Sequence, residues 1–156
     1  MLRWKNWASL LFWLALCLGA GALGSLVTMD SIKTWYPALH KPVWTPPAWL
    51  FGPVWTTLYL MMAVAAQRIT LRANRRLPLA LFGLQLALNA AWSPVFFGAH
   101  QVGGALVILT ALCLTLLATT ITFFRRDAFA GALLVPYLTW CIFAGTLNLA
   151  IWRLNP

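Results

Sequence analysis

Five long apolar runs divide this sequence, and the connectors between most of them are short and basic. The runs cover about residues 7–29, 46–71, 77–97, 102–124 and 128–152. A helix of about 20 apolar residues, rising 1.5 Å per residue, spans the hydrocarbon core of a bilayer. Charged residues make up 8% of the chain, whereas a soluble domain carries about 25%. The sequence therefore predicts an all-α membrane protein, a bundle of five transmembrane helices forming one domain over residues 1–156.

The first run also has features of a secretory signal peptide. Arg3 and Lys5 precede it, and it contains the small residues 19–22. However, the run is longer than the apolar core of a typical signal peptide. We therefore favour a retained helix.

The segment between the first two runs is rich in tryptophan and proline. Residues 35–59 hold four of the ten tryptophans and five of the nine prolines. Proline fixes φ and pushes the preceding residue towards extended backbone. This predicts a rigid aromatic loop that leads into a helix with Pro46 and Pro47 in its first turn and Thr45 as its N-cap. Such a loop suggests a lid over a flat, apolar ligand.

The net charge of +9 points to lipid rather than to nucleic acid. The basic residues sit at the ends of apolar runs, where they reach lipid phosphates. Five spans place eight of them on the side of the N-terminus and three on the other. The eight are Arg3, Lys5, Arg68, Arg72, Arg75, Arg76, Arg125 and Arg126, and the three are Lys33, Lys41 and Arg153. In a bacterial inner membrane, this asymmetry predicts a cytoplasmic N-terminus and an external lid.

No pattern of catalytic or metal-binding residues occurs in the sequence. Cys17, Cys113 and Cys141 fall inside apolar runs without CxxC spacing, which predicts neither a disulfide framework nor a zinc site. Asp30 and Asp127, the two acidic residues, lie outside the spans, so no carboxylate pair is expected. We expect no obligatory cofactor. The histidines, His40 and His100, are expected in loops on the lid side, either solvated or against a ligand.

Helical periodicity assigns the faces of the third run. Gln85, Asn89, Trp92 and Phe96 share one face, and an amide facing lipid is costly, so this face should point into the bundle. The opposite face consists of small residues, which favour close helix packing, here against a second copy of the chain. These small residues are Gly83, Ala87 and Ala91.

The second and fifth runs have similar mixed faces. Trp55 and Tyr59 share a face of the second run, and Trp140, Ala144, Leu147 and Asn148 cluster on the fifth. Two interpretations remain open from periodicity alone. The faces either line an apolar pocket with a few orienting polar atoms, or fill the core of the bundle.

Several motifs occur in order along the chain. They read WY at 35–36, HKPVWTPPAW at 40–49, GPVWTTLY at 52–59, QLALNAAWSPVFFG at 85–98, PYLTW at 136–140 and TLN at 146–148. Together they closely resemble the translocator protein family, whose members are also called tryptophan-rich sensory proteins or peripheral benzodiazepine receptors. The resemblance covers essentially the whole chain.

This resemblance implies a five-helix bundle, usually a homodimer, with a pocket capped by the loop after the first helix. Family members bind porphyrins and haem-type tetrapyrroles, synthetic benzodiazepine and isoquinoline ligands and, in animals, cholesterol. The resemblance implies that Trp44 and Trp49 belong to the lid and that Tyr59 lies close to the pocket. The residues that it implies as the pocket lining are Trp55, Asn89, Trp92, Trp140, Ala144 and Leu147.

The sequence departs from the family pattern at three places. The cholesterol motif of the animal proteins needs a tyrosine, which residues 147–153 lack, and such motifs are weak evidence even when intact. Sterol binding is therefore left open. Val43 replaces a tryptophan of some bacterial members, and Gly104 replaces a tryptophan of the animal proteins. Both changes would enlarge or soften the pocket.

The sequence leads to three functional hypotheses. The first is a membrane receptor or carrier that binds porphyrin or haem in tetrapyrrole handling or stress sensing. The second is a light- and oxygen-dependent porphyrin-degrading enzyme, in which Trp140 and Trp92 would be the redox residues. The third is a transporter of sterol, lipid or porphyrin, although the spans lack the charges and inverted repeats typical of alternating access.

Overall fold

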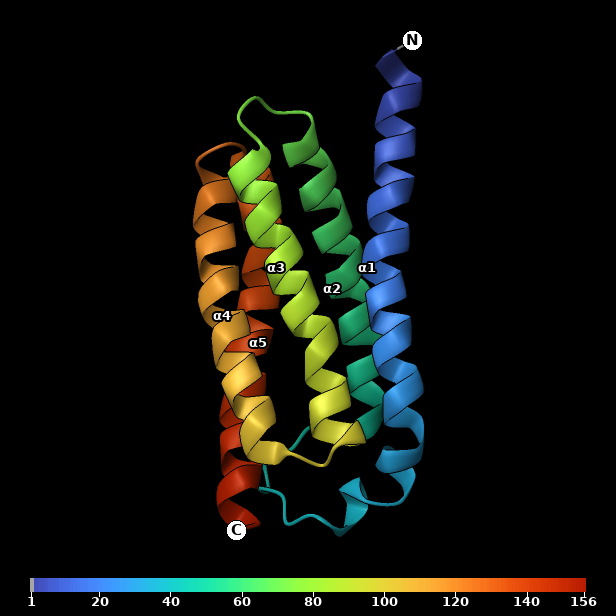
Figure 1. Ribbon diagram of the computed structural model, residues 1–156, viewed down its shortest axis with the longest axis vertical. Helices are drawn as coiled ribbons and strands as arrows, with labels where there is room; N and C mark the ends of the chain where they lie inside the picture. The colour runs from blue at the N-terminus through green and yellow to red at the C-terminus, as the bar shows by residue number, and fades with distance from the viewer. Residues whose placement is uncertain (1) are drawn as a thin grey trace.

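Figure 1 shows the computed structural model, a bundle of five long α-helices. The structure describes residues 2–156, with side chains from Asn6 onward, so the side chains of Arg3 and Lys5 lie outside the described residues. The helices are α1 (Leu2–Lys33), α2 (Ala48–Thr70), α3 (Arg76–Ser93), α4 (Val102–Phe124) and α5 (Ala128–Leu154). Each is long and apolar enough to cross a membrane, and residues 2–156 contain no strand. The predicted fold class is confirmed.

The helices pack so that the two ends of the bundle differ. α1 packs against α2 and α3, α4 packs against α3 and α5, and α2 packs against α5. The connectors at 71–75 and 125–127 lie at the end that also holds the N-terminus, which we call the basic end (Figure 1). Residues 34–47, the α3–α4 connection and the C-terminus lie at the opposite end, which we call the loop end.

Helix α2 begins two residues later than the sequence predicts. Pro46 and Pro47 lie before the helix, and Pro47 is its N-cap residue with extended backbone. The reason is that Pro47 disfavours helical backbone at the residue before it. Thr45 therefore does not cap the helix, and its hydroxyl donates instead to the Pro42 carbonyl at 2.7 Å.

Helix α3 changes its hydrogen-bonding pattern at Pro94, where the sequence predicts a continuous helix to residue 97. The segment η2 (Pro94–Gly98) is a π-helical turn, in which the Ala99 N–H donates to the Pro94 carbonyl at 2.8 Å. Proline lacks the N–H that would continue the α-helical ladder. The turn places Phe96 and Phe97 in the buried core near the loop end.

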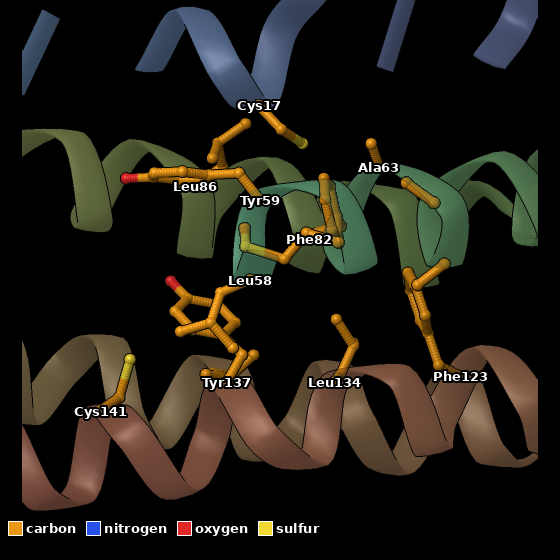
Figure 2. Close-up of a cluster of buried hydrophobic side chains, with 14 of the residues drawn as sticks. Cys17, Leu58, Tyr59, Ala63, Phe82, Leu86, Phe123, Leu134, Tyr137 and Cys141 are labelled. Carbon is orange, nitrogen blue, oxygen red and sulfur yellow. The ribbon is translucent and has the colours of Figure 1, made fainter. Parts of the chain in front are cut away.

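The main core lies between all five helices. Figure 2 shows Cys17 of α1, Tyr59 of α2, Phe82 of α3, Phe123 of α4 and Tyr137 of α5 in one buried cluster. The Phe82 ring stacks on Phe123 at 5.9 Å and meets Trp13 edge-on at 5.3 Å between ring centroids. These contacts form an aromatic cluster in the half of the bundle towards the basic end.

An ion cluster around the buried Asp127 carboxylate joins α2 to α5 at the basic end. The Asp127 carboxylate accepts hydrogen bonds from Arg68 at 2.8 Å, from Arg72 and from the Ala130 N–H at 3.0 Å, so it also caps α5. Burial acts to raise the pKa of Asp127, but the bonds from Arg72, Arg68 and Ala130 outweigh it and hold that pKa well below its usual range.

Candidate functional site

The half of the bundle towards the loop end contains a cavity of about 900 Å³. This volume is near the upper end of the range of about 300–1,000 Å³ for small-molecule pockets. All five helices and residues of the α1–α2 loop contribute to its mostly apolar lining. Seven of the nine ligand-binding residues predicted above line it, namely Trp55, Tyr59, Asn89, Trp92, Trp140, Ala144 and Leu147.

The deep end of the cavity carries a hydrogen-bonded chain across three helices. The Tyr59 hydroxyl of α2 donates to Asn89 Oδ1 of α3 at 2.6 Å, and Asn89 Nδ2 donates to the Tyr137 hydroxyl of α5 at 2.9 Å. The Trp55 ring stacks on Tyr59 at 5.6 Å between centroids. The amide of Asn89 is therefore fixed from both sides, and Oδ1 keeps a second lone pair for a ligand.

Trp92 is held rigidly in the wall of the cavity. Its ring stacks on Phe96 at 5.0 Å, and its Nε1 donates to Asn148 Oδ1 at 3.2 Å. Asn148 Nδ2 in turn donates to the Val102 carbonyl of α4 at 2.9 Å. Asn148 thus orients the indole and joins α3, α4 and α5.

Trp140 differs from Trp92 because its indole N–H is buried without a hydrogen-bond partner among the described residues. Its ring lies edge-on to Phe51 at 5.8 Å. A buried donor without a partner is costly, and this nitrogen has almost no surface that a molecule in the cavity could contact.

The α1–α2 loop covers the cavity with different residues from those that the sequence predicts. Trp44 packs against Phe143 and Trp49 is 72% exposed, and neither lines the cavity. Lys41, Pro42, Thr45 and Pro46 line it instead. The Lys41 ammonium donates to the carbonyls of residues 36, 37 and 39 and lies over the Tyr36 ring, which ties the loop together.

Helix α1 supplies a wall that sequence reasoning missed. Gly21, Gly24, Ser25 and Thr28 line the cavity. A Cβ on Gly21 would overlap the Tyr59 ring, so glycine is needed for α1 to pack there. The helical spacing of these small residues was the available signal, but small residues also favour ordinary helix packing.

The cavity lining includes exposed residues of α1 and α2, which indicates an opening between these two helices. Several lining residues are also exposed on the surface of the bundle, where lipid would surround a membrane span. They are Leu18, Met29 and Ile32 of α1, and Ala48, Gly52 and Thr56 of α2. The opening therefore faces the apolar part of a bilayer.

The two histidines lie away from the cavity lining. The His100 ring stacks on Trp35 at 4.2 Å and its Nε2 is 3.3 Å from Ser31 Oγ, while the backbone of His40 bonds the Asn155 side chain. From residue 2 onward, no three histidine, cysteine or acidic residues are grouped so that they could hold a metal ion. The arrangement is suited to binding a flat apolar molecule through aromatic faces and a few fixed polar atoms.

One family model and three known proteins are similar to this chain over most of its length. The model of the TspO/MBR family matches residues 13–153. The tryptophan-rich sensory protein of Cereibacter sphaeroides is 41% identical over 150 residues, which cover 96% of this chain and 93% of that protein. Protein CrtK of Rhodobacter capsulatus is 40% identical, with coverages of 90% and 88%. The human translocator protein is 41% identical, with coverages of 92% and 88%.

Proposed function

The chain belongs to the TspO/MBR family of membrane proteins, and on that premise we propose that it is a receptor or carrier for porphyrin or haem-type tetrapyrroles. The observation that carries the proposal is the cavity of about 900 Å³ with Trp55, Trp92 and Trp140 in its lining. Indole rings offer flat faces on which a conjugated macrocycle stacks. The benzodiazepine and isoquinoline ligands implied by the resemblance are also flat and apolar.

Polar atoms at the cavity surface support the same ligand class. The second lone pair of Asn89 Oδ1, at the deep end of the cavity, could accept a hydrogen bond from a ring N–H of the ligand. Lys41 is the one charged residue in the described lining, and it lies in the loop. We propose that it attracts the carboxylates of the tetrapyrrole, which would leave the macrocycle in the apolar part of the cavity.

We propose that the ligand enters from the membrane. The opening between α1 and α2 leads to lipid, and porphyrins partition into bilayers because their rings are apolar. For a bacterial inner membrane, the charge count further predicts a cytoplasmic N-terminus. Reporter fusions after residues 74 and 156 test this orientation. A cytoplasmic reporter at 74 with an external one at 156 supports it, and the reverse result contradicts it.

A titration with protoporphyrin in the dark tests the binding function. Detergent-purified protein should show saturable quenching of tryptophan fluorescence. Trp140→Phe should weaken the affinity about fivefold, since an aromatic contact contributes about 1 kcal/mol. Trp152→Phe is the matched control, because Trp152 lies on the same helix, is exposed and is not in the lining. Absence of saturation would sink the tetrapyrrole proposal.

A photo-oxidative enzyme is the second candidate, and the position of Trp140 in the cavity wall favours it. In this reaction the excited pigment and oxygen would supply the oxidising power, and Trp140 would take part in electron transfer. The same samples distinguish the two candidates under light. Protein-dependent loss of the porphyrin bands that Trp140→Phe abolishes, with binding retained, supports the enzyme. A stable pigment spectrum supports the receptor.

We also propose that two copies of the chain associate through α3. Gly83, Ala87 and Ala91 are exposed on one face of this helix, and a Cβ on Gly83 would meet nothing within 4 Å. Small residues let helix backbones approach closely. Ala87→Leu should therefore shift the protein towards monomer in light scattering, while Val107→Leu, which enlarges an exposed side chain on α4, should not. An unchanged mass for Ala87→Leu would exclude this interface.

A further inference from the structure

Six polar or charged side chains are buried in the part of the chain that the structure describes, and five of them are hydrogen-bonded. The five are Asn89, Thr119, Thr120, Asp127 and Asn148, each of which bonds a side chain or a backbone group. Gln85 is the exception. Its side chain is fully buried, and neither Nε2 nor Oε1 has a partner among the described residues.

An unpaired amide inside a membrane protein is unfavourable. The bilayer core offers no solvent to replace the missing partners, so buried polar groups in membrane spans are satisfied internally. In native proteins an orphaned buried polar group commonly marks an ordered water molecule or another small guest. The Gln85 amide can donate two hydrogen bonds and accept two. The expected guest must therefore both donate and accept.

The position of Gln85 identifies where such a guest would lie. Asn89 is the deepest residue of α3 in the cavity lining, and Gln85 is one helical turn further from the loop end. On its other side, Phe82 belongs to the aromatic cluster with Trp13 and Phe123. Gln85 thus lies between the polar floor of the cavity and this aromatic cluster, and it is not itself in the lining.

We propose that Gln85 holds a buried water site beneath the floor of the cavity. Water is the smallest molecule that both donates and accepts, and a neutral amide with no nearby metal-binding group favours it over an ion. Side chains one turn apart on a helix have Cβ atoms about 5–6 Å apart, a span that one bridging water covers. Asn89 Nδ2 donates one of its two hydrogens to Tyr137, and the second hydrogen is the partner that we assign to this water. The site needs no tetrapyrrole.

Radiolytic labelling of the ligand-free protein in ¹⁸O-water tests this site. Hydroxyl radicals formed from a buried water label the side chains next to it even where bulk solvent has no access. Phe82 and Leu86, which flank Gln85 and are buried, should carry ¹⁸O. Leu134, a fully buried side chain on α5, sets the background. In Gln85→Leu, labelling of Phe82 and Leu86 should fall to that background.

Two results would overturn the proposal. One is labelling of Phe82 and Leu86 at the Leu134 background in the unmodified protein, and the other is labelling that survives in Gln85→Leu. If the leucine variant does not fold, Gln85→Met keeps the length of the side chain and removes both polar atoms, and the same two outcomes apply. Porphyrin binding is measured separately, so failure of the water site and failure of the proposed function are distinguishable.

Discussion

The two halves of the bundle use side chains of different size on the same helix. Towards the basic end, α2 presents the fully buried Ala63, Ala65 and Ala66, which let neighbouring helices approach closely. Towards the loop end, α2 presents Phe51 and Trp55, which are only partly buried and line the cavity. On α2, therefore, small residues pack closely in the basic half and large rings line the cavity in the other half.

The two halves also differ in the kind of polar contact that holds them together. The basic end is fixed by the Asp127 cluster and by the bond from Trp13 Nε1 to Thr70 Oγ1 at 2.9 Å. The described side chains around the cavity in the loop-end half are joined by neutral hydrogen bonds, from Tyr59 to Asn89 and from Trp92 to Asn148, rather than by ion pairs. We infer that the basic half provides most of the stability and that the loop-end half is kept available for a ligand.

Loss of the ion cluster should have the largest effect on stability. Asp127→Ala should lower the free energy of unfolding by about 2–3 kcal/mol, because it removes charged hydrogen bonds and a helix cap. This loss in the free energy of unfolding is smaller than the loss expected for a fully buried ion pair. The side chains of Arg68 and Arg72 are 38% and 49% exposed, so water can solvate them when the carboxylate is removed. Thermal unfolding in detergent measures the change.

Asp127→Asn is the matched control for that measurement. It keeps an acceptor for the Ala130 N–H but loses the charge, so the loss should be smaller than for alanine. Porphyrin affinity of the folded fraction should stay unchanged in both variants, since Asp127 is outside the cavity lining. A large change in affinity would show that the two halves are coupled.

The same cluster should make the protein sensitive to acid. The pKa of Asp127 is lowered in the folded state, whereas an unfolded aspartate has a pKa of about 3.9. Its contribution to stability is therefore complete above about pH 5 and is lost as the pH falls below about 4. Unfolding midpoints between pH 3 and 7 should show this decline, and Asp127→Asn should flatten it. Equal slopes in both proteins would contradict the assignment.

A methyl group at Gly21 should disturb the loop-end half. In Gly21→Ala the new Cβ would overlap the Tyr59 ring, and overpacking costs about 1–3 kcal/mol. Gly19→Ala is the control, because a Cβ there would meet nothing within 4 Å. We expect a lower midpoint and weaker porphyrin binding for Gly21→Ala only. Equal behaviour of the two variants would show that α1 is not closely packed on Tyr59.

Removal of the Tyr59 hydroxyl should have the smallest effect. Tyr59→Phe deletes one neutral hydrogen bond to Asn89, which corresponds to about 1 kcal/mol. The bond from Asn89 to Tyr137 remains. A difference in unfolding midpoint measures the loss, and Trp55, which stacks on Tyr59, should keep its fluorescence maximum. A shifted maximum would show that the hydroxyl positions the ring.

Periodicity and length are sufficient to predict the bundle and the faces of its helices. Gln85, Asn89 and Phe96 are buried as the helical spacing predicts, and Gly83 and Ala87 are exposed. These orientations can be predicted from the sequence because an amide that faces lipid is unfavourable, whichever helices surround it. Seven of the nine ligand-binding residues that the family motifs named line the cavity for the same reason, since they lie on these inward faces.

Features that depend on loop conformation or on the distance between helices could not be predicted. The two tryptophans at 44 and 49 lie outside the cavity lining, while Lys41 lies in it because its ammonium folds back onto loop carbonyls. The ion pairs of Asp127 could not be predicted either, because nothing in the local sequence indicates that it meets Arg68 and Arg72. Likewise, the missing partners of Gln85 emerge only when the helices are placed together.

The most direct test of a ligand site in the loop-end half is porphyrin affinity in a variant whose cavity is filled. Ala144 lines the cavity, and Ala132 is exposed on the same helix towards the basic end. Porphyrin absorbance titrations should give saturable binding for the unmodified protein and for Ala132→Trp. Affinity should fall at least about tenfold for Ala144→Trp, which corresponds to about 1.4 kcal/mol. Equal affinity in all three proteins would place the porphyrin outside this cavity and contradict the account.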